Sequence, residues 1–280
     1  MNRGFLLMLL KYNRVVIYLI FFILSTVPFF LKLTTNNHFK FNEKELFEEK
    51  WTSLRSVNDI IKYVDSICGT NLNSSKLDTL MFTEELSRII KLRFKHGLTN
   101  YSISDNWIAY LSGKLIWPHF SAIVDPNDIL KYNEGLCSQQ TIVFLEVLKK
   151  RGIMARSVGL GFKEGPGHFL SEVQYNKGWH LYDVSLEPNW VGVTEPHRSM
   201  DYYIHNKDSL YCGYKYRMSI GMFNKLMSTV NYGETDKFPA KKMLVFHHIT
   251  HFITVLLPWL FLVLTISSLY KKRKLKRVNL

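Results

Sequence analysis

Three residues between positions 137 and 183 have the types needed for nucleophilic catalysis. Cys137 directly precedes an amphipathic stretch, Ser138–Lys150, that is typical of a helix. At a helix N-terminus the free backbone N–H groups and the helix dipole stabilise a thiolate, and the same N–H groups can bind an oxyanion. A thiol nucleophile also needs a base, and the base needs a residue that orients it. We therefore predict that Cys137 is the nucleophile, His168 the base and Asp183 the orienting carboxylate.

A β-hairpin is the element that would bring the base and the carboxylate together. Two strand-like runs, His168–Tyr175 and Trp179–Ser185, are joined by the turn sequence Asn176-Lys177-Gly178. If the turn has two residues, Leu170 opposes Asp183, and His168 lies on the same face one diagonal step along. That step is roughly 7–8 Å between backbones, within reach of an imidazole–carboxylate hydrogen bond. A three-residue turn with a bulge would change this register.

The remaining elements are predicted to be helices followed by a small antiparallel sheet. Apolar periodicity predicts helices over residues 42–67 and from about Ser75 to Lys95. Ser104 or Asp105 can cap a short third helix that runs through Leu111. Another strand-like run, Ile153–Gly161, separates the helix after Cys137 from the hairpin. This order of elements predicts an α+β fold.

The residues around these three positions resemble the core of the transglutaminase-like superfamily. The resemblance covers about residues 126–186 and consists of four short motifs in order. They are Gly135-Leu136-Cys137 at a helix start, Gly152-Ile153-Met154-Ala155-Arg156 in a strand, Gly167-His168 with Glu172-Val173, and Trp179 with Asp183. The resemblance implies a papain-like fold with a Cys-His-Asp triad. In this sequence Val184-Ser185 follows the aspartate, in place of a proline-containing turn.

Other side chains near the motifs are expected to have structural roles. Glu172 is expected to pair with Arg156, and Trp179 to pack behind the three catalytic candidates. The motifs assign no side chain to an oxyanion hole, for which the candidates are Trp107, Trp117, His119, Tyr132 and Gln139.

A cluster of histidines near the second apolar run raises the question of a metal. His247 and His251 would share a helix face, which suits a metal, but the glutamate of a metalloprotease helix is missing. We therefore expect His247, His248 and His251 to be interfacial histidines, and we predict neither a metal nor a cofactor.

The charge of the chain is concentrated at its two ends. Of a formal net charge of +13, three positive charges lie in residues 1–14 and six in residues 271–280, and neither segment contains an acidic residue. A nucleic-acid-binding surface is therefore not predicted. Next to each basic end is an apolar run, over residues 15–33 and 252–270, long enough to cross a hydrocarbon core of roughly 30 Å as a helix. The alternatives are a cleavable signal peptide for the first run and a buried core helix for the second.

The two basic ends predict the topology of the chain. Both should face the cytoplasm, which places the central domain outside it, in the periplasm or at the cell exterior. We predict cytoplasmic tails over 1–14 and 271–280, transmembrane helices over 15–33 and 252–270, a helical region over 34–125 and a transglutaminase-like core over 126–245. The expected partners are membrane lipid, a protein or peptide substrate near the membrane, and envelope proteins. Cys68 and Cys212 could form a disulfide there, or remain thiols.

Two classes of function fit these features. The first is a thiol enzyme that acts on amide bonds, with hydrolysis preferred to cross-linking because water needs no second binding site. The second is a non-catalytic, membrane-tethered binding or scaffold module of an envelope or polysaccharide assembly. The presence of Cys137, His168 and Asp183 together favours the enzyme, since a fold kept only for binding does not need all three.

Overall fold

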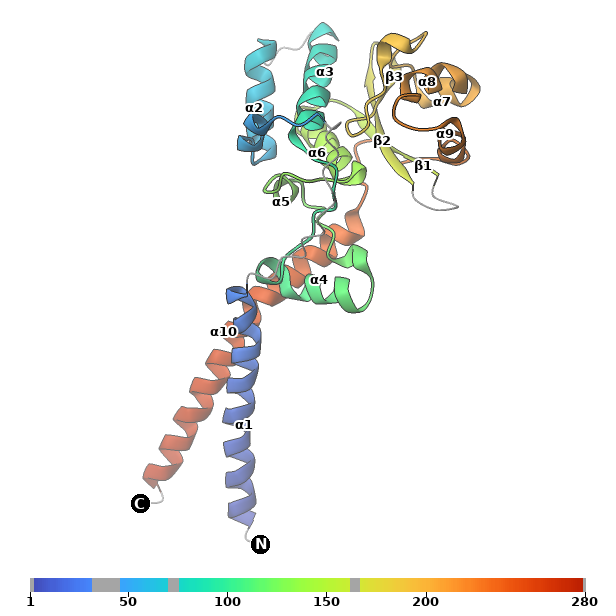
Figure 1. The fold of residues 1–280 in the computed structure, drawn as a ribbon. Helices are drawn as coiled ribbons and strands as arrows, with labels where there is room; N and C mark the ends of the chain where they lie inside the picture. Colours follow the sequence, from blue (N-terminus) through green and yellow to red (C-terminus); the bar gives the residue numbers. More distant parts are fainter. Residues whose placement is uncertain (1–2, 32–45, 70–75, 162–166, 279–280) are drawn as a thin grey trace. The chain divides into compact units, whose positions relative to one another are not determined.

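A computed structural model describes residues 3–31, 46–69, 76–161 and 167–278, which form two compact units (Figure 1). The helical unit comprises Met1–Asn36, Asn100–Ala122 and Lys242–Leu280. The α+β unit comprises Asn37–Thr99 and Ile123–Lys241, and it contains all three predicted catalytic residues.

Apolar helices from the two ends of the chain dominate the helical unit. α10 (Lys241–Val278) is long and apolar enough to cross a membrane, and it contains the whole predicted span 252–270. α1 (Arg3–Thr26) and the 3-10 turn η1 (Val27–Phe30) carry a shorter apolar segment, Arg14–Phe30. This segment is shorter than a membrane-spanning helix, so the described residues do not show the predicted first span. Residues 32 and 33 of the predicted first span lie outside the described residues. The two helices touch where the Phe21 ring stacks on Phe261, with centroids 5.1 Å apart.

A third helix of this unit, α4 (Ile103–Leu115), is followed by the 3-10 turn η3 (Pro118–Phe120). The predicted cap at Ser104 or Asp105 is wrong, because Ser102 is the N-cap. The Ser102 side chain accepts a hydrogen bond from the Asp105 N–H, and the Asp105 carboxylate accepts one from the Ser102 N–H, which forms a capping box. The helix therefore starts earlier than predicted, and it also continues past Leu111.

Helices of the α+β unit that precede its sheet are the 3-10 helix η2 (Glu49–Ser53), α2 (Val57–Cys68), α3 (Lys76–Arg93), the short α5 (Pro126–Ile129) and α6 (Cys137–Lys150). The single helix predicted over 42–67 is broken between η2 and α2, and residues 42–45 lie outside the described residues. Ser56 causes the break, since its hydroxyl accepts a hydrogen bond from the Asp59 N–H at 3.1 Å and so starts a new helix. α3 corresponds to the second predicted helix, whose expected first residue, Ser75, is also outside the described part of the chain.

The described residues of this unit contain one antiparallel sheet with strand order β3-β2-β1-β4. β1 (Ala155–Leu160), β2 (His168–Tyr175) and β3 (Gly178–Tyr182) correspond to the three predicted strands, whereas β4 (Val230–Tyr232) is an additional strand. The turn between β2 and β3 has two residues, Asn176 and Lys177, with φ of 50° and 63°, as a type I′ turn requires. Tyr175 pairs with Gly178 and Ser171 with Tyr182, which confirms the predicted register.

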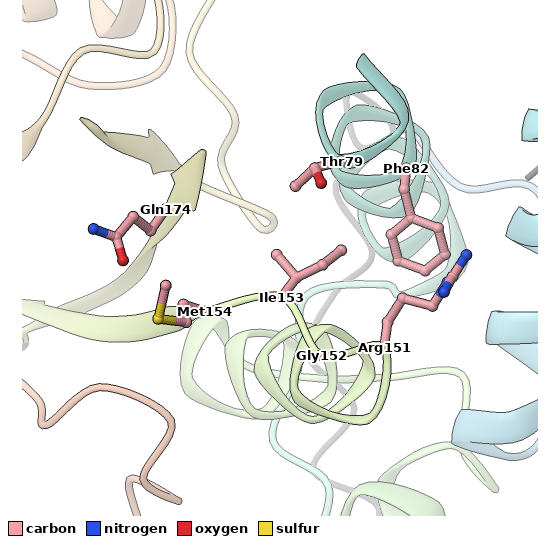
Figure 2. A pocket seen from close by; sticks show the side chains of 7 residues that line it. All are labelled: Thr79, Phe82, Arg151, Gly152, Ile153, Met154 and Gln174. Carbon is pink, nitrogen blue, oxygen red and sulfur yellow. The ribbon is translucent and has the colours of Figure 1, made fainter. Parts of the chain in front are cut away.

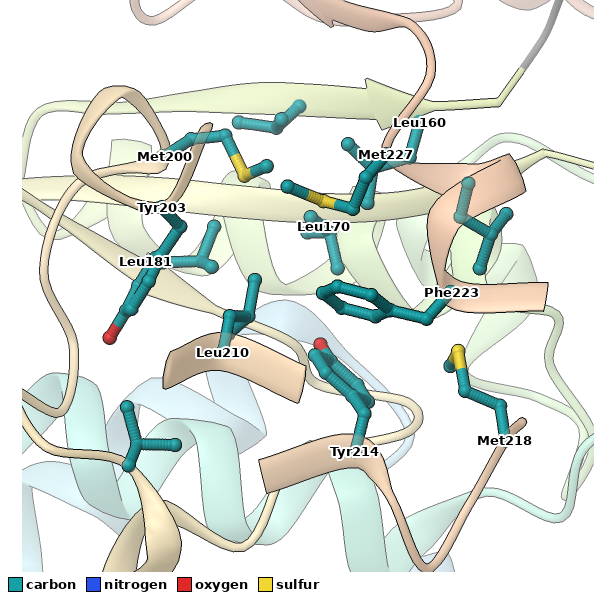
Figure 3. Packing of buried hydrophobic residues seen from close by; sticks show 13 residues of the cluster. Leu160, Leu170, Leu181, Met200, Tyr203, Leu210, Tyr214, Met218, Phe223 and Met227 are labelled. Atoms are coloured by element: carbon teal, nitrogen blue, oxygen red, sulfur yellow. The ribbon is translucent and has the colours of Figure 1, made fainter. Parts of the chain in front are cut away.

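Helices cover both faces of the sheet. α6 packs on one face, where the Phe144 ring is 5.9 Å from that of Tyr182. Three short helices, α7 (Met200–His205), α8 (Lys207–Tyr214) and α9 (Ile220–Leu226), pack on the opposite face, onto the sheet residues Val158, Leu160, Leu170 and Leu181 (Figure 3). The predicted α+β class is therefore confirmed, although these three helices go beyond what the sequence predicted.

Candidate functional site

Cys137 is the first residue of α6, one position before the predicted helix start. Its side chain is half-buried and forms hydrogen bonds with the side chain of His168 and with the backbone of Phe169. The N–H groups in the first turn of a helix have no carbonyl partner within that helix. The sulfur therefore lies at the positive end of the α6 dipole.

His168 is the first residue of β2, and Asp183 directly follows the last residue of β3, the strand next to β2. His168 Nε2 lies 2.7 Å from Asp183 Oδ2, and both side chains are buried. Because Nε2 bonds to the carboxylate, the hydrogen bond between His168 and Cys137 uses the other ring nitrogen, Nδ1. The structure thus brings the three predicted residues into one hydrogen-bonded row from three different elements.

The Asp183 carboxylate accepts five hydrogen bonds. Oδ2 receives His168 Nε2 and the hydroxyl of Tyr214, each at 2.7 Å. Oδ1 receives the N–H and the hydroxyl of Ser185, both at 3.1 Å, and the N–H of Leu186 at 3.0 Å. The residues after Asp183 therefore form a tight turn around its carboxylate without a proline. This turn also ends β3 at Tyr182, three residues before the predicted end of the strand.

Tyr214, in α8, is a member of the site that the sequence did not predict. It lies 31 residues after Asp183 in a short helix, and its ring is buried in the cluster shown in Figure 3. No motif spacing links the two residues, and Tyr214 is one of 15 tyrosines in the chain. The sequence alone therefore carries no signal that would single it out.

Charges within the row shift the pKa of each of its members. Burial alone would raise the pKa of Asp183, but the charge and hydrogen bond of His168 lower it, helped by Leu186 and Tyr214. Burial would lower the pKa of His168, yet the Asp183 carboxylate raises it well above its ordinary value. Burial would likewise raise the pKa of Cys137, and the hydrogen bond and charge of His168 bring it below its ordinary value. These directions favour a thiolate–imidazolium pair backed by an ionised carboxylate.

Gln139 fixes the start of α6 in place. Its Oε1 accepts the N–H groups of Thr99 at 3.0 Å and Leu136 at 3.2 Å. Its Nε2 donates to the carbonyls of Thr99 and Ile123, both at 2.8 Å. Both amide hydrogens are already donated, so Gln139 is a structural residue and not an oxyanion donor. Among the other oxyanion candidates, Trp107, Trp117 and His119 belong to the helical unit, and Tyr132 lies half-buried in the loop before Cys137.

Arg93, the last residue of α3, bonds to the loop that precedes Cys137. It is fully buried and donates to the carbonyls of Leu54 at 3.1 Å, Leu130 at 2.5 Å and Tyr132 at 2.8 Å. Burial lowers the pKa of Arg93 to about 10. A basic residue in the last turn of a helix is common, because it interacts favourably with the helix dipole. The sequence therefore does not predict that Arg93 bonds to three distant carbonyls.

The pairing expected between Arg156 and Glu172 is confirmed. Arg156 contacts the Glu172 carboxylate at 2.7 Å, and Glu172, which is fully buried, also accepts the Met200 N–H at 2.6 Å. The Arg156 guanidinium lies over the Trp179 ring, 4.4 Å from its centroid. Trp179 therefore packs against Arg156, and its expected place behind the three catalytic candidates stays a prediction.

Neither a disulfide nor a metal site is found in the described part of the chain. Cys68 and Cys212 are not joined to each other, which settles the alternative left open by the sequence. Among the described residues no group of three or more histidine, cysteine or acidic side chains could hold a metal ion. His247, one of the three clustered histidines, is buried and bonds through Nε2 to the carbonyl of Phe120 at 2.9 Å.

Two of the hollows on the described surface of the α+β unit are large enough to consider as binding sites. One, of about 340 Å³, is lined by residues that include Phe169, Tyr232, Lys237 and Phe238, so it shares Phe169 with the Cys137 site. The other, of about 150 Å³, lies between α3, the end of α6 and the start of β1 (Figure 2). Arg151 lines this second hollow and forms an ion pair with Asp65 at 3.0 Å. Cys137, His168 and Asp183 do not line the first hollow, so Phe169 is its link to the hydrogen-bonded row.

Comparison with known proteins finds one weak structural similarity. The sequence matches no family model and no curated protein. A solved structure described as "Crystal structure of a TGase" matches with 14% sequence identity and a TM-score of 0.29. The match covers 66% of this chain and 41% of that one, so this chain spans less than half of that structure's length. The similarity is weak, and the function has to be argued from the site itself.

Proposed function

We propose that this protein is a membrane-anchored, transglutaminase-like cysteine enzyme that acts on amide bonds. Cys137 is the nucleophile, His168 the general acid and base, and Asp183 the residue that orients His168. The observation that carries this proposal is the continuous row of hydrogen bonds from the thiol at the start of α6, through the imidazole, to a buried carboxylate. Such a row is what a thiol nucleophile needs to be ionised and to pass a proton to a leaving group.

The proposed reaction uses these three groups in two steps. The Cys137 thiolate attacks the amide carbonyl, and the oxyanion that forms is stabilised by N–H groups at the start of α6. The C–N bond then breaks, the amine takes the proton from His168, and the acyl group remains on sulfur as a thioester. Water attacks the thioester, His168 removes one of its protons, and the C–S bond breaks to give a carboxylic acid and the Cys137 thiolate, which restores the thiolate–imidazolium pair. Asp183 keeps the imidazole in one orientation through both steps.

The hollow beside Phe169 is the proposed binding place for the substrate. Its lining combines the aromatic rings of Phe169, Tyr232 and Phe238 with the charged Lys237. Such a mixture suits a peptide segment, whose side chains offer apolar surface while its backbone offers hydrogen-bonding groups. A protein or peptide is therefore the proposed substrate, and water the proposed acceptor.

Anchoring is proposed through α10 and the apolar segment of α1. α10 has the length and composition of a span, and many of its apolar side chains face outward, among them Phe252, Trp259 and Val263. The basic ends then place both termini in the cytoplasm and the enzyme unit outside it. The substrate would accordingly lie at the outer surface of that membrane.

The ionisation state of Cys137 provides the test of catalysis. In a Cys68→Ser background, the rates at which iodoacetamide alkylates Cys137 and the exposed Cys212 are measured by peptide mass spectrometry between pH 4 and 10. We expect Cys137 to react well below pH 7, and this reactivity to disappear in His168→Ala, where the imidazole no longer offsets the effect of burial on the thiol. Cys212 serves as the internal control and should be unaffected. A Cys137 profile that matches Cys212 and ignores the substitution would contradict the proposal and favour a binding module.

A second measurement separates hydrolysis from amine transfer. Peptides from envelope proteins are incubated with the enzyme in the presence of a fluorescent primary amine, and the products are identified by mass spectrometry. We expect free carboxylic acid and no incorporated amine. Incorporation that depends on Cys137 would keep the triad but replace water by an amine as the acceptor.

A further inference from the structure

The end of α4 and the residues after it expose a group of apolar side chains in the helical unit. Leu115 is 80% exposed, Ile116 75% and Trp117 49%, and Leu111 is exposed one turn before Leu115 on the same side of the helix. We call these four residues the α4 tip. The tip belongs to the same unit as the candidate membrane span.

Buried polar contacts hold α4 against α10. Asn106 is fully buried and interrupts the helical geometry of α4, with φ of −152° and ψ of 81°. Its Nδ2 donates to Thr250 Oγ1 at 2.9 Å, and its Oδ1 accepts from Thr254 Oγ1 at 3.3 Å. Because all three side chains are buried and both threonines bond to Asn106, these contacts fix the position of α4 along the axis of α10.

The segments before and after α4 contact α10 at His247, which precedes Thr250 and Thr254 in the sequence. The Tyr101 ring contacts His247 edge-on with centroids 4.9 Å apart, and His247 Nε2 bonds to the Phe120 carbonyl. These contacts to α10 therefore fall between residues 247 and 254, which is about 10 Å of helix axis at roughly 1.5 Å per residue.

This part of α10 is where its long apolar run begins, at Phe252. α4 also contacts η1, which ends the apolar segment of α1. In Figure 1, α4 lies across α10 at this point and does not run alongside it. If α10 crosses a membrane, α4 is consequently located at the boundary between the hydrocarbon core and water.

We propose that the α4 tip inserts into the membrane–water interface and binds lipid there. The inference rests on the membrane anchoring proposed above and adds a third point of contact, beside the two apolar helices. Tryptophan prefers this interface because its ring is apolar while its N–H can bond to water or headgroups. Lys114, between Leu111 and Leu115, has an apolar stem and a charge that can reach lipid phosphates. A helix that lies in the plane of the interface with its apolar side chains toward the acyl chains is a common mode of membrane binding.

Site-directed fluorescence measures the depth of the tip. The three native cysteines of the full chain are replaced by serine, and single cysteines labelled with an environment-sensitive dye are introduced at Ile116, Val263 or Lys242. Each variant is reconstituted in phosphatidylcholine–phosphatidylglycerol nanodiscs without spin-labelled lipid, with lipid labelled near the headgroup end of the acyl chain, and with lipid labelled near the terminal methyl, which reports on Val263. Val263, in the middle of the apolar run, is the lipid-exposed control, and Lys242, at the start of α10, is the water-exposed control.

The inference predicts that the label at Ile116 is quenched by the spin-labelled lipid several-fold more than the label at Lys242. If Val263 is quenched but Ile116 behaves like Lys242, the inference is wrong while the anchoring by α10 stands. A label at Ile116 that is shielded from water but not quenched by lipid also overturns it, because a protein would then cover the tip. If Val263 itself is not quenched, the anchoring fails together with the inference, and the alkylation profile of Cys137 still tests catalysis independently.

Discussion

The hydroxyl of Tyr214 and Nε2 of His168 bond to the same carboxylate oxygen of Asp183, each at 2.7 Å. The carboxylate is thus held from α8 as well as from His168 at the start of β2. Two donors on one oxygen stabilise the ionised carboxylate and leave it little freedom to rotate. The position of the imidazole therefore depends on a helix that packs on the far face of the sheet from α6.

Replacing Tyr214 by phenylalanine tests this dependence. The ring keeps its place in the apolar cluster, while the hydrogen bond to a charged group is lost, which costs about 1.5–3 kcal/mol of stability. We expect a lower free energy of unfolding in urea and a several-fold slower alkylation of Cys137 at pH 6. Ser185→Ala is the control, because two backbone N–H groups still bond to Oδ1 after its hydroxyl is removed. Equal effects of the two substitutions would show that Tyr214 has no special role.

Asp183→Asn should change how stability depends on pH. The pKa of Asp183 is lowered on folding, so its contribution is present above the ordinary value of 3.8 and is lost as the pH falls through the folded value. The pKa of His168 is raised to about 10, so its contribution is complete below the ordinary value of 6.5 and is lost as the pH rises toward 10. The difference in unfolding free energy between the wild type and the variant should therefore be largest between pH 4 and 6.5.

Urea denaturation at several pH values measures that difference, and a difference that does not change with pH would contradict the coupling of the two residues. Activity should fall by about four orders of magnitude if Asp183 holds the working orientation of the base.

Gln139→Leu should destabilise the protein because it leaves four backbone groups without their side-chain partner. Each unsatisfied buried group costs about 1–3 kcal/mol. The neighbouring Gln140 is equally buried and donates one hydrogen bond, to the Gly135 carbonyl at 2.8 Å, which makes Gln140→Leu a matched control. We expect the midpoint of thermal unfolding to fall much further for Gln139→Leu. A variant that keeps its stability but loses activity would show instead that Gln139 acts on the oxyanion.

The buried ion pair between Arg156 and Glu172 gives a prediction that concerns stability alone. Arg156→Met leaves the fully buried Glu172 carboxylate without its cation, which costs about 3–5 kcal/mol. The double variant Arg156→Met/Glu172→Leu should recover most of that loss, because no charge is left buried. Chemical denaturation of the wild type, both single variants and the double variant measures the coupling. If the two single effects simply add, the pair does not interact as described.

The sequence alone predicts the register of the hairpin and the three residues that form the hydrogen-bonded row. Their relationship is local: a two-residue turn fixes the register of β2 and β3, and the register places His168 beside Asp183. Cys137 was predictable because a helix start has its own sequence signals and its own electrostatics. The α+β class followed from the order of the same elements.

The support of the row depends on distant contacts, which the sequence does not encode in any spacing. Tyr214 reaches Asp183 only because three short helices fold back over the sheet, and helices of six to eight residues show little periodicity. Gln139 was visible as a polar residue near Cys137, but its partners, Thr99 and Ile123, come from both sides of a separate segment. The break before α2 could not be seen from the apolar pattern, since a single serine cap at Ser56 interrupts an otherwise helical stretch.

The path of the chain between the two units has a practical consequence. The chain leaves the α+β unit after Thr99 and returns at Ile123, and the Ile123 N–H donates to the Thr99 carbonyl at 3.0 Å. Gln139 bonds to the same two residues, so the exit and the return are held next to each other from inside the α+β unit. Residues 100–122 are therefore a removable insertion, which a short glycine linker can replace without separating the ends that it joins. A chain shortened in this way and trimmed of α1 and α10 would lack the proposed anchors and keep the thiol-bearing unit, with its sheet and its hydrogen-bonded row uncut.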